Sequence, residues 1–366
     1  MMTKKIAIFH NFMDNIGGAE FVALFLARGL NADIYTTNID SEKIKKMGFS
    51  DVLPRIKSIG KVPIKAPFRH QLALWKFRRL NLGKEYGFYI IAGDWAVSGA
   101  VNNKPNLWYA HGPINELWEF KNFVRDNLLV WWKKPIYELW VLFNRYLTRK
   151  YSKRVDKLVC NSKNTKKRIK KYYKRSAEVI YPPVDCKKYD YKSEKGYWLS
   201  VNRLLNHKRV DLQLEAFSKM PDEKLIIVGS YEVGAEQFEN YKRYLEGIMT
   251  SNVEVRSWIT DSELVNLYNN SKGFIATAGN EDFGMTLVEA MAAGKPVIAG
   301  NEGGYKETVI DGKTGMLIED IDAKKIISAV KKIGKNLSKY KVDCLKRAKE
   351  FDVDNFIKRI KKEVER

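Results

Sequence analysis

The amino-acid sequence predicts an α/β fold of two doubly wound, Rossmann-like domains that face each other across a cleft. Short apolar segments alternate with amphipathic segments along both halves of the chain, as expected for parallel strands linked by helices. A chain of 366 residues exceeds the usual span of one core, and 45% hydrophobic residues can fill two. Between the halves, residues 181–196 carry two prolines and a charged run without helical or strand periodicity. This segment is therefore the predicted linker.

Each half of the chain contains six predicted strands that are short and almost continuously apolar. In the first half they are residues 4–10, 32–37, 88–93, 106–112, 157–162 and 178–183. In the second half they are residues 197–202, 224–230, 253–258, 272–278, 295–300 and 314–319. Strands of this kind form parallel sheets that helices cover on both faces. The expected domains are residues 1–180 and residues 197–345, and ligands should bind beyond the carboxyl ends of their strands.

The cysteine content and the apolar pattern indicate a cytoplasmic protein. Cys160, Cys186 and Cys344 are widely spaced and form no Cys-x-x-Cys pair, so neither a disulfide framework nor a zinc site is expected. The N-terminal apolar stretch is too short for a signal peptide, and no apolar run reaches the roughly 18 residues of a membrane-spanning helix. We therefore expect a soluble protein of the cytosol, or a peripheral protein on the cytoplasmic membrane face.

The chain is strongly basic, with 65 Lys and Arg residues against 43 Asp and Glu residues and a net charge of +22. Much of this charge lies in residues 119–178, where Trp131, Trp132 and Trp140 are interleaved with basic residues and Pro135 divides two helices. Two interpretations stand side by side. Either the segment binds an anionic membrane surface, or its aromatic residues pack into the first domain beneath a solvated basic face. Nucleic acid is not an expected partner, because the charge comes without a recognisable binding motif.

The segment NEDFGMTLVEAMAAGKPVI, residues 280–298, is the most informative for function. Interpreted as a loop, a helix N-terminus and a strand, it exposes backbone N–H groups where a diphosphate can bind without a metal. Glu289 can accept hydrogen bonds from a vicinal diol such as a ribose, and Glu281 in the loop reaches toward the sugar or its phosphate. A charged loop before an ordinary helix is the alternative. The donor-binding residues expected at the helix start are Phe283, Gly284, Met285 and Thr286.

These residues resemble the Glu-x7-Glu motif of the retaining glycosyltransferases of family 4. The similarity continues through the flanking SKGFIATA and AAGKPVIAGNEGGYKETVIDGKTGMLIE, over about fifty residues, which a chance motif would not match. It implies that Glu281 contacts the hydroxyl groups of the donor sugar and that Glu289 holds the nucleotide ribose. It also implies the two-domain GT-B arrangement, in which residues 346–366 provide a C-terminal helix that packs back on the first domain. The apolar face of that helix is Phe356, Ile357, Ile360 and Val364.

Two cations follow the first predicted strand of the second domain. Arg203 and Lys208 lie in one loop, in positions suited to a diphosphate leaving group. They also resemble the Arg and Lys that neutralise the nucleotide diphosphate in family 4, although His207 stands where the family usually has an acidic residue. We therefore expect both cations to act in catalysis, with fortuitous surface charge as the alternative.

Gly17 and Gly18 lie between the first predicted strand and the first helix, where the backbone can approach a ligand closely. The Gly-x-Gly-x-x-Gly pattern of dinucleotide sites is absent, and a bare Gly-Gly is more often a tight turn. Many family 4 enzymes, however, carry a Gly-Gly-x-Glu sequence here that lies against the donor phosphate and the acceptor. The resemblance implies the same role for Gly17 and Gly18, and for Glu20 beside them.

His111 ends a predicted strand and precedes Gly112 and Pro113, so its ring should project from the sheet edge toward the cleft. In mannosyltransferase-like members of family 4, the comparable histidine lies beside the donor sugar, which implies a catalytic role for His111. Gly112 departs from the family pattern and leaves the acceptor side open. A solvent-facing structural histidine is the alternative.

The segment VEVRSWITDSELVNLY resembles the strand and loop that meet the nucleotide base. The resemblance implicates Ser257, Trp258 and Ile259 in donor binding. Simple burial of Trp258 is the alternative, so the identity of the base stays open.

Two Asp-x-Asp strings, at residues 320–322 and 352–354, would suggest a metal site. Each precedes a helical stretch, however, and aspartate is a preferred helix N-cap. Neither a metal nor another cofactor is expected.

These features together predict a retaining, metal-independent glycosyltransferase that moves a hexose from a nucleotide-diphosphate sugar to a lipid-linked glycan or polysaccharide. Mannose from GDP-mannose is favoured, and a UDP-sugar is the first alternative. No second carboxylate is placed as a nucleophile, so the departing phosphate should accept the acceptor's proton. A non-catalytic sugar-binding or membrane-binding module of the same fold is the second alternative. An epimerase or a phosphorylase would need an acid–base pair or a cofactor lysine that we do not find in the sequence.

Overall fold

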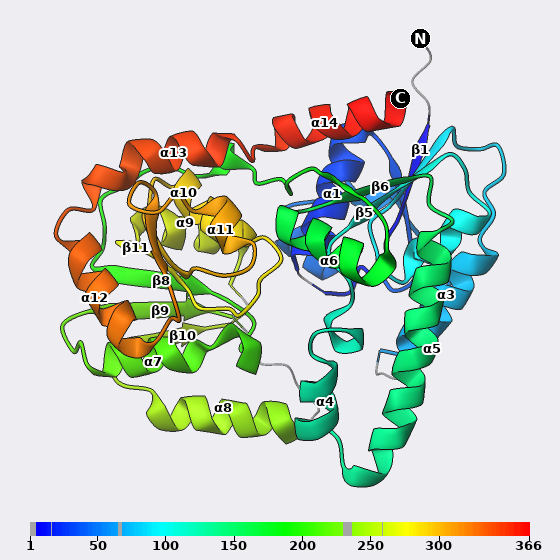
Figure 1. Cartoon of the computed structure of the whole chain (residues 1–366). Helices are drawn as coiled ribbons and strands as arrows, with labels where there is room; N and C mark the ends of the chain where they lie inside the picture. Colours follow the sequence, from blue (N-terminus) through cyan, green and yellow to red (C-terminus); the bar gives the residue numbers. More distant parts are fainter. Residues whose placement is uncertain (1–4, 16, 65–67, 230–235, 258) are drawn as a thin grey trace. The chain divides into compact units, whose positions relative to one another are not determined.

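The computed structural model describes residues 5–15, 17–64, 68–229, 236–257 and 259–366. The chain divides into two compact units, Met1–Pro182 with Phe356–Arg366 and Pro183–Asn355. The first division, after Pro182, falls inside the segment expected as the linker. Each unit is built around one parallel sheet with helices packed against it (Figure 1). No helix in the described part of the chain combines the length and the apolar character needed to cross a bilayer.

The sheet of the first unit has the strand order β3-β2-β1-β4-β5-β6-β7, with all neighbours parallel. The strands are β1 (Ile6–Phe9), β2 (Asp33–Thr36), β3 (Ile56–Ser58), β4 (Phe88–Ile91), β5 (Asn106–Ala110), β6 (Lys157–Cys160) and β7 (Glu178–Val179). All six predicted strands are present. The edge strand β3 was not predicted, because its three residues are only partly buried and carry no apolar run. The order reverses between β1 and β4, which is the switch point of a doubly wound sheet.

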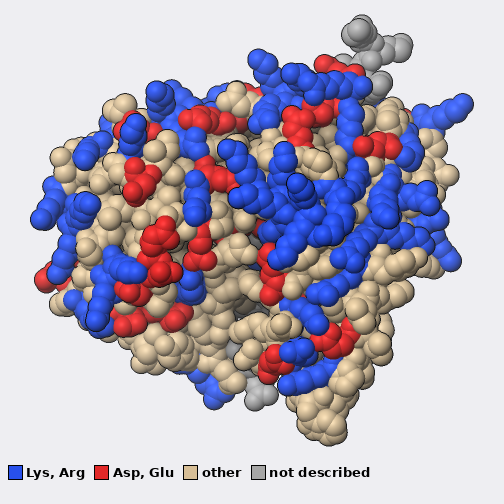
Figure 2. Space-filling model, in the orientation of Figure 1, with Lys and Arg blue, Asp and Glu red and all other residues tan. Residues whose placement is uncertain are grey.

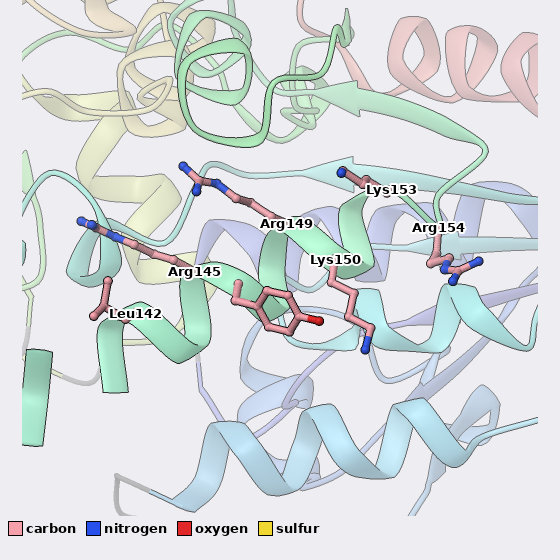
Figure 3. Close-up of a pocket in the computed structure, with 7 residues that line it drawn as sticks. Leu142, Arg145, Arg149, Lys150, Lys153 and Arg154 are labelled. Atoms are coloured by element: carbon pink, nitrogen blue, oxygen red, sulfur yellow. The ribbon is translucent and has the colours of Figure 1, made fainter. Parts of the chain in front are cut away.

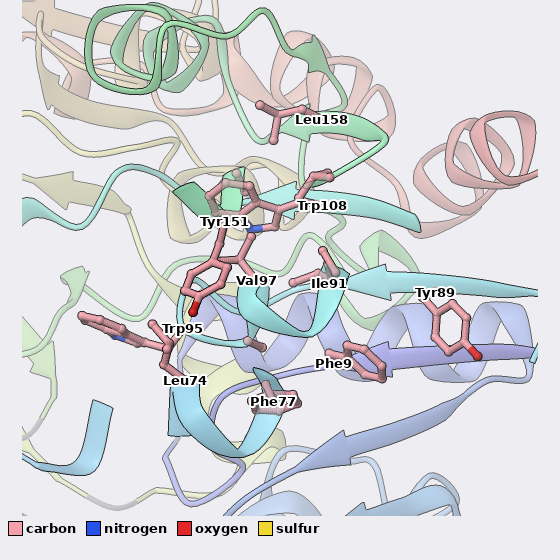
Figure 4. Packing of buried hydrophobic residues seen from close by; sticks show 14 of the residues in the cluster. Phe9, Leu74, Phe77, Tyr89, Ile91, Trp95, Val97, Trp108, Tyr151 and Leu158 are labelled. Carbon is pink, nitrogen blue, oxygen red and sulfur yellow. The ribbon is translucent and has the colours of Figure 1, made fainter. Parts of the chain in front are cut away.

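The main helices of the first unit are α1 (Gly18–Leu30), α2 (Ser41–Lys46), α3 (Phe68–Arg79), η2 (Ala96–Val101), α4 (Lys121–Asn127), α5 (Lys134–Ser152), α6 (Lys163–Tyr173) and α14 (Val353–Glu365). Of these, α3, η2, α5 and α6 enclose an aromatic core with the sheet (Figure 4). Phe9 of β1 lies at the centre of this core, with ring centroids 5.7 Å from Phe77 and 5.7 Å from Tyr89. Full burial of a large apolar side chain contributes about 1.5–3 kcal/mol, so this cluster stabilises the unit strongly.

The C-terminal helix α14 packs on the first unit through the apolar face expected from the sequence. Phe356 lies with its ring centroid 5.6 Å from that of Tyr109, and Lys157 Nζ donates to Glu363 O at 2.5 Å. A Cβ atom on Gly29 would lie 2.5 Å from Ile357 Cδ1, so glycine permits the close approach of α1 and α14. The chain joins this unit from Phe356, later than the expected residue 346.

The sheet of the second unit has the order β10-β9-β8-β11-β12-β13, again with parallel neighbours. The strands are β8 (Tyr197–Val201), β9 (Lys224–Val228), β10 (Val253–Arg256), β11 (Gly273–Ala276), β12 (Val297–Gly300) and β13 (Gly315–Ile318). The helices are α7 (Val210–Ser218), α8 (Glu236–Ile248), α9 (Asp261–Asn270), α10 (Met285–Ala292), α11 (Tyr305–Thr308), α12 (Ala323–Gly334) and α13 (Lys341–Lys349). The switch point lies between β8 and β11.

Helix α13 explains why residues 346–355 stay with the second unit. Cys344 is fully buried, and its Sγ lies 3.4 Å from Lys295 O and 3.4 Å from Thr314 O, either of which can accept its single S–H. Ala348 and Phe351 are buried as well, and the Phe351 ring lies 5.3 Å from that of Phe283. These contacts hold the segment on the second unit as far as the first turn of α14.

Candidate functional site

In the second unit, the candidate residues lie beyond the carboxyl ends of the two strands at the switch point. Arg203 follows β8 and is exposed, and a short 3-10 turn, η6 (Asn206–Lys208), comes next. The loop of residues 277–284 follows β11 and leads into α10. The loop N–H of Gly279 donates to His207 O at 2.8 Å, so the two segments lie side by side. This is where doubly wound sheets bind ligands.

Lys208 and Glu281 form an ion pair that joins these two segments. Lys208 Nζ donates to Glu281 Oε2 at 2.5 Å, and both side chains are mostly buried. Burial alone would raise the pKa of Glu281. The positive charge and the hydrogen bond of Lys208 lower it, and with the other nearby cations they outweigh burial, so the pKa lies below its ordinary value. Glu281 is therefore ionised at neutral pH. The backbone of Lys208 is held as well, since Thr277 Oγ1 donates to Lys208 O at 2.7 Å.

Arg209 and Glu302 form a second ion pair in the same loops, which the sequence analysis did not identify. Arg209 adopts a left-handed backbone conformation, with φ of 49°, and its Nε donates to Thr277 O at 2.7 Å. Glu302 also accepts from the N–H of Asn280 at 3.1 Å. The pair fixes the loop that carries Glu281. No sequence signal pointed to it, because its members are 93 positions apart.

The start of α10 presents backbone N–H groups, and its N-cap residue has no side chain that could cap them. Gly284 is the N-cap residue, with φ of 91°, and a Cβ at this position would lie 2.7 Å from the Tyr305 ring. Met285 and Thr286 open the helix and are partly buried, and Phe283 before them is buried. Glycine is therefore required at 284 both for the conformation and for the space. An uncapped helix start is a suitable site for a phosphate.

Glu289, one turn further along α10, is held by a residue that the sequence analysis missed. Tyr268 in α9 donates from its hydroxyl to Glu289 Oε2 at 2.7 Å. Burial raises the pKa of Glu289, while the Tyr268 hydrogen bond acts in the opposite direction. The tyrosine uses one carboxylate oxygen and orients the other, which suits a carboxylate that accepts hydrogen bonds from a diol.

The residues expected to meet the nucleotide base lie after β10. Ser257 is exposed and Ile259 is partly buried, in the segment that leads to α9. Trp258 lies outside the described residues.

In the first unit, the glycines expected to bind the donor lie at the start of α1. Gly17 is the N-cap residue in an extended conformation, and Gly18 is the first residue of the helix. A Cβ atom on Gly17 would lie 2.7 Å from Glu20 Oε2, so the Glu20 carboxylate folds back over the helix start. Glu20 Oε1 lies 3.6 Å from Nε2 of His10, which follows β1.

His111 lies close to this cluster, beyond the end of β5. Its Nε2 is 3.1 Å from Ala92 O, and Nδ1 of His10 is 3.2 Å from the same carbonyl oxygen. Ala92 follows β4, so the two histidines gather at the switch point of the first sheet. Burial lowers the pKa of His111 to about 4, and the ring of His10 acts in the same direction. His111 is therefore neutral at physiological pH.

The aspartate strings serve as helix caps, as expected. Asp322 is the N-cap of α12 and accepts from the N–H of Lys325 at 2.8 Å, and Asp352 Oδ1 accepts from the N–H of Asp354 at 3.0 Å. Among the described residues, His, Cys, Asp and Glu form no cluster that could hold a metal ion.

Comparison with protein families gives two adjacent matches. The model described as "Glycosyltransferase Family 4" matches residues 16–188, and the model described as "Glycosyl transferases group 1" matches residues 185–351. The chain is also similar to alpha-1,3/1,6-mannosyltransferase ALG2 of Dictyostelium discoideum, at 28% identity over 86% of this chain and 86% of the relative. The corresponding protein of Neurospora crassa is 26% identical over 87% of this chain and 80% of the relative.

Solved structures share the fold over almost the whole chain. The Anabaena protein Alr3699/HepE in complex with UDP-glucose has a TM-score of 0.77 at 17% identity, covering 99% of both chains. Sucrose-phosphate synthase from Thermosynechococcus elongatus has a TM-score of 0.76 at 14% identity, covering 98% of both chains. At these identities the similarity establishes the fold.

Proposed function

We propose that this chain, which belongs to glycosyltransferase family 4 and has the GT-B fold, transfers mannose from a nucleotide-diphosphate donor to a glycan acceptor. The preferred donor is GDP-mannose, and the acceptor is a lipid-linked glycan or a polysaccharide. Mannose is supported by the similarity to ALG2 mannosyltransferases, which extends over most of the chain and most of the length of those relatives.

The observation that carries the proposal is the Lys208–Glu281 ion pair, in the loops that lead to the glycine-capped start of α10. An ammonium group has three N–H donors, so Lys208 can hold Glu281 and still donate to a phosphate oxygen. Arg203 lies close enough to lower the pKa of Glu281, and its guanidinium is suited to a second phosphate contact. Together with the N–H groups of Met285 and Thr286, these cations supply the positive charge that a leaving diphosphate needs. We therefore propose that the reaction requires no metal.

The two glutamates then take separate roles. Glu281 is ionised and anchored by Lys208, so it accepts hydrogen bonds from hydroxyl groups of the donor sugar. Glu289, oriented by Tyr268, accepts hydrogen bonds from the nucleotide ribose. In the first unit, Gly17, Gly18 and His111 keep the roles that the family resemblance implies. Because His111 is neutral, it acts there as a hydrogen-bonding group rather than as a cation.

The proposed reaction breaks the bond between the anomeric carbon and the phosphate oxygen. Arg203, Lys208 and the start of α10 stabilise the negative charge that develops on the diphosphate. The acceptor hydroxyl bonds to the anomeric carbon on the face that the phosphate leaves, and its proton passes to the departing phosphate oxygen. The anomeric configuration is therefore retained without a covalent intermediate on the protein.

A thermal-shift screen against GDP, UDP, ADP and their sugar conjugates tests the proposal first, since a ligand of the folded state raises the melting temperature. We expect the largest rise with GDP and GDP-mannose. A rise with UDP compounds instead would assign the chain to the UDP-sugar enzymes. No rise with any nucleotide in a folded sample would contradict the transferase proposal and favour a non-catalytic module.

Transfer itself is then measured with labelled donor and membrane lipid extract or polysaccharide as the acceptor. The expected product carries the label with retained configuration at the new linkage. Donor binding without transfer to any acceptor would also favour the non-catalytic module.

A further inference from the structure

Exposed apolar side chains are concentrated in one part of the first unit. Among the described residues, thirteen of the sixteen exposed large apolar side chains lie between Ile64 and Tyr146. The other three are Tyr244, Ile310 and Val342, scattered over the second unit. Single exposed apolar residues are normal on a protein surface, whereas a contiguous group marks a site of interaction. The concentration therefore requires a local explanation.

Helices α4 and α5 carry the centre of this group. They form a hairpin whose turn contains Trp131, with 81% of its surface exposed, and Trp132. Helix α5 has two apolar faces. The inner face contacts the core of the unit through the buried Val141 and the partly buried Trp140. The outer face is exposed and consists of Ile136, Leu139, Leu142, Phe143 and Tyr146.

The structural interpretation of this segment, in which its aromatic residues pack into the first domain, therefore holds for some of them and not for others. Trp140 packs against the core, as the structural interpretation expected, but Trp131 does not. Pro135 lies in the first turn of α5, where proline is tolerated. Farther along, Arg168 of α6 is almost fully buried and pairs with Glu119, so this part of the basic segment is structural. The exposed apolar surface ends before it.

The neighbouring helix α3 extends the same surface. Gln71 of α3 donates to Asn144 of α5 at 3.2 Å, and the two helices run side by side in Figure 1. The exposed residues Phe68, Leu72 and Trp75 recur at helical spacing, so they lie on one face of α3. We use the term hairpin surface for this face together with Trp131, Trp132 and the outer face of α5.

A basic hollow of about 680 Å³ borders the hairpin surface on α5. Leu142 and Tyr146 belong to both, so the hollow begins where the apolar face ends. Figure 3 shows Arg145, Arg149 and Lys153 extending toward the same side of the helix, as their spacing of four residues requires. The cations that line the hollow are Arg145, Arg149, Lys150, Lys153 and Arg154.

Backbone carbonyl groups hold two of these cations in place, and their positive charges are not balanced by carboxylates within the described residues. Arg145 Nε donates to Leu117 O at 2.6 Å, and Arg149 Nε donates to Tyr172 O at 2.9 Å. Within the described part of the chain, none of the five forms an ion pair with a carboxylate. The nearby Glu138 is already paired with Lys121 and Arg125. In Figure 2, Lys and Arg side chains gather over α5 and α6, while the end of the hairpin is mostly of other residue types, although Lys133 lies in its turn.

We propose that the hairpin surface and the basic hollow bind an anionic lipid bilayer. The tryptophans and the outer face of α5 enter the interface between headgroups and acyl chains, as aromatic and aliphatic residues of amphipathic helices do. The five cations of the hollow bind the lipid phosphates next to them, and each basic residue near an anionic surface favours binding by about fivefold. An anionic bilayer has charged headgroups directly above its acyl chains, so a protein surface with adjacent basic and apolar parts can contact both.

Charge favours a bilayer over a second copy of the chain as the occupant. Each copy has a net charge of +22, so self-association would bring like charges together. An anionic bilayer, in contrast, attracts the positively charged protein, and the exposed apolar residues can then insert between its headgroups. The inference rests on the first unit alone and does not depend on the donor or the acceptor proposed above.

Vesicle flotation of the full chain tests the proposal, with phosphatidylglycerol vesicles compared with pure phosphatidylcholine vesicles. We expect binding to the anionic vesicles at least about tenfold stronger than to the neutral ones. The double variant Leu139→Glu with Phe143→Glu should lose at least about tenfold in binding, because it places charge in the apolar contact. Its matched control is Val342→Glu with Ile310→Glu, which alters exposed residues of the second unit and should bind like the parent.

A second pair of variants tests the cations. Lys150→Glu with Lys153→Glu should weaken binding by at least about tenfold, whereas Lys324→Glu with Lys331→Glu removes the same charge elsewhere and should have a much smaller effect. Unchanged melting temperatures show that the variants are folded. The proposal is overturned if the parent does not bind anionic vesicles, or if the hairpin and control variants lose binding equally. It is also overturned if the parent sediments as a dimer that Leu139→Glu with Phe143→Glu dissociates, with no binding to vesicles.

Discussion

The two units are built alike but differ in what their surfaces expose. Both are parallel sheets that place polar residues beyond the strand ends at the switch point. In the second unit these residues are ion pairs, Lys208–Glu281 and Arg209–Glu302, next to a helix start. In the first unit they are two histidines that share the Ala92 carbonyl, and the helices alongside expose a broad apolar surface. The same topology thus carries ion pairs at the strand ends of one unit and an exposed apolar surface on the helices of the other.

This contrast shows that the shared sheet topology does not determine the role of a unit. Strand order sets where loops converge, and the residues on those loops decide the chemistry. The outer helix faces are free to vary, because they do not contribute to the core. Variants that alter only one unit should therefore affect only the properties of that unit.

The largest expected effect concerns the core of the first unit. Phe77→Ala should lower the free energy of unfolding by about 3–5 kcal/mol, because it leaves a cavity beside Phe9 and Tyr89. Hydrogen exchange should show the loss of protection in β1 and β4 to be greater than in β8 and β11. Val342→Ala, at an exposed position, should change the stability by no more than about 0.5 kcal/mol. Equal loss of protection in both sheets would show that the units unfold as one.

The next effect concerns the Lys208–Glu281 ion pair of the second unit. Lys208→Ala should lower kcat by about 10²–10³-fold, because the leaving diphosphate and Glu281 lose the same cation. Glu281→Ala should also abolish most transfer while the protein stays folded. Lys324→Ala serves as the control and should keep the parental rate. Full activity of either site variant would contradict the proposed mechanism, whereas vesicle binding should be unaffected in all three.

A smaller effect on donor binding is expected from Tyr268, which donates a hydrogen bond to Glu289. Tyr268→Phe removes a hydrogen bond to a carboxylate, so the KM for the donor should rise about tenfold with little change in kcat. The hydrogen bond of Tyr268 lowers the pKa of Glu289, so its loss should raise that pKa further. Donor binding should then weaken first at the acidic end of the pH range. Tyr244→Phe, an exposed position, is the control, and an unchanged pH profile would show that Tyr268 has only a packing role.

The smallest effect is the pH dependence of stability that His111 contributes. Its pKa of about 4 lies below the ordinary value of 6.5, so between these pH values the unfolded chain binds a proton that the folded chain does not. Stability should therefore rise with pH across this window, by up to about 1.4 kcal/mol per pH unit for one histidine. His111→Asn should make the urea-unfolding curves less dependent on pH between 4 and 6.5. An unchanged dependence would mean that His111 is solvated like a free histidine.

The positions of the strands and of most candidate residues could be predicted, but several of their partners could not. Every predicted strand is present, since an apolar run between turn residues is a local signal. Glu281 and Lys208 were both identified, and the structure joins them although they are 73 positions apart. Tyr268, Glu302 and His10 were missed as partners of the site. Their side chains are ordinary in sequence, and only contact across the fold distinguishes them.

The basic aromatic segment illustrates the same limit at the surface. Periodicity indicated an amphipathic helix, but α5 carries apolar residues around most of its circumference. The sequence cannot show which of two apolar faces a neighbouring sheet will cover. The structure buries the face with Val141 and leaves the face with Leu139 exposed.

The sequence by itself determined the alternation of strands and helices and the loops that carry the candidate residues. These features depend on local periodicity, on glycine and proline positions, and on short motifs, all of which lie within a few residues of one another. Tertiary structure alone decided which carboxylates are paired, which histidines meet at Ala92, and which face of α5 stays exposed. Burial and pairing depend on the elements that face each residue, and strand order brings those elements together from distant parts of the chain.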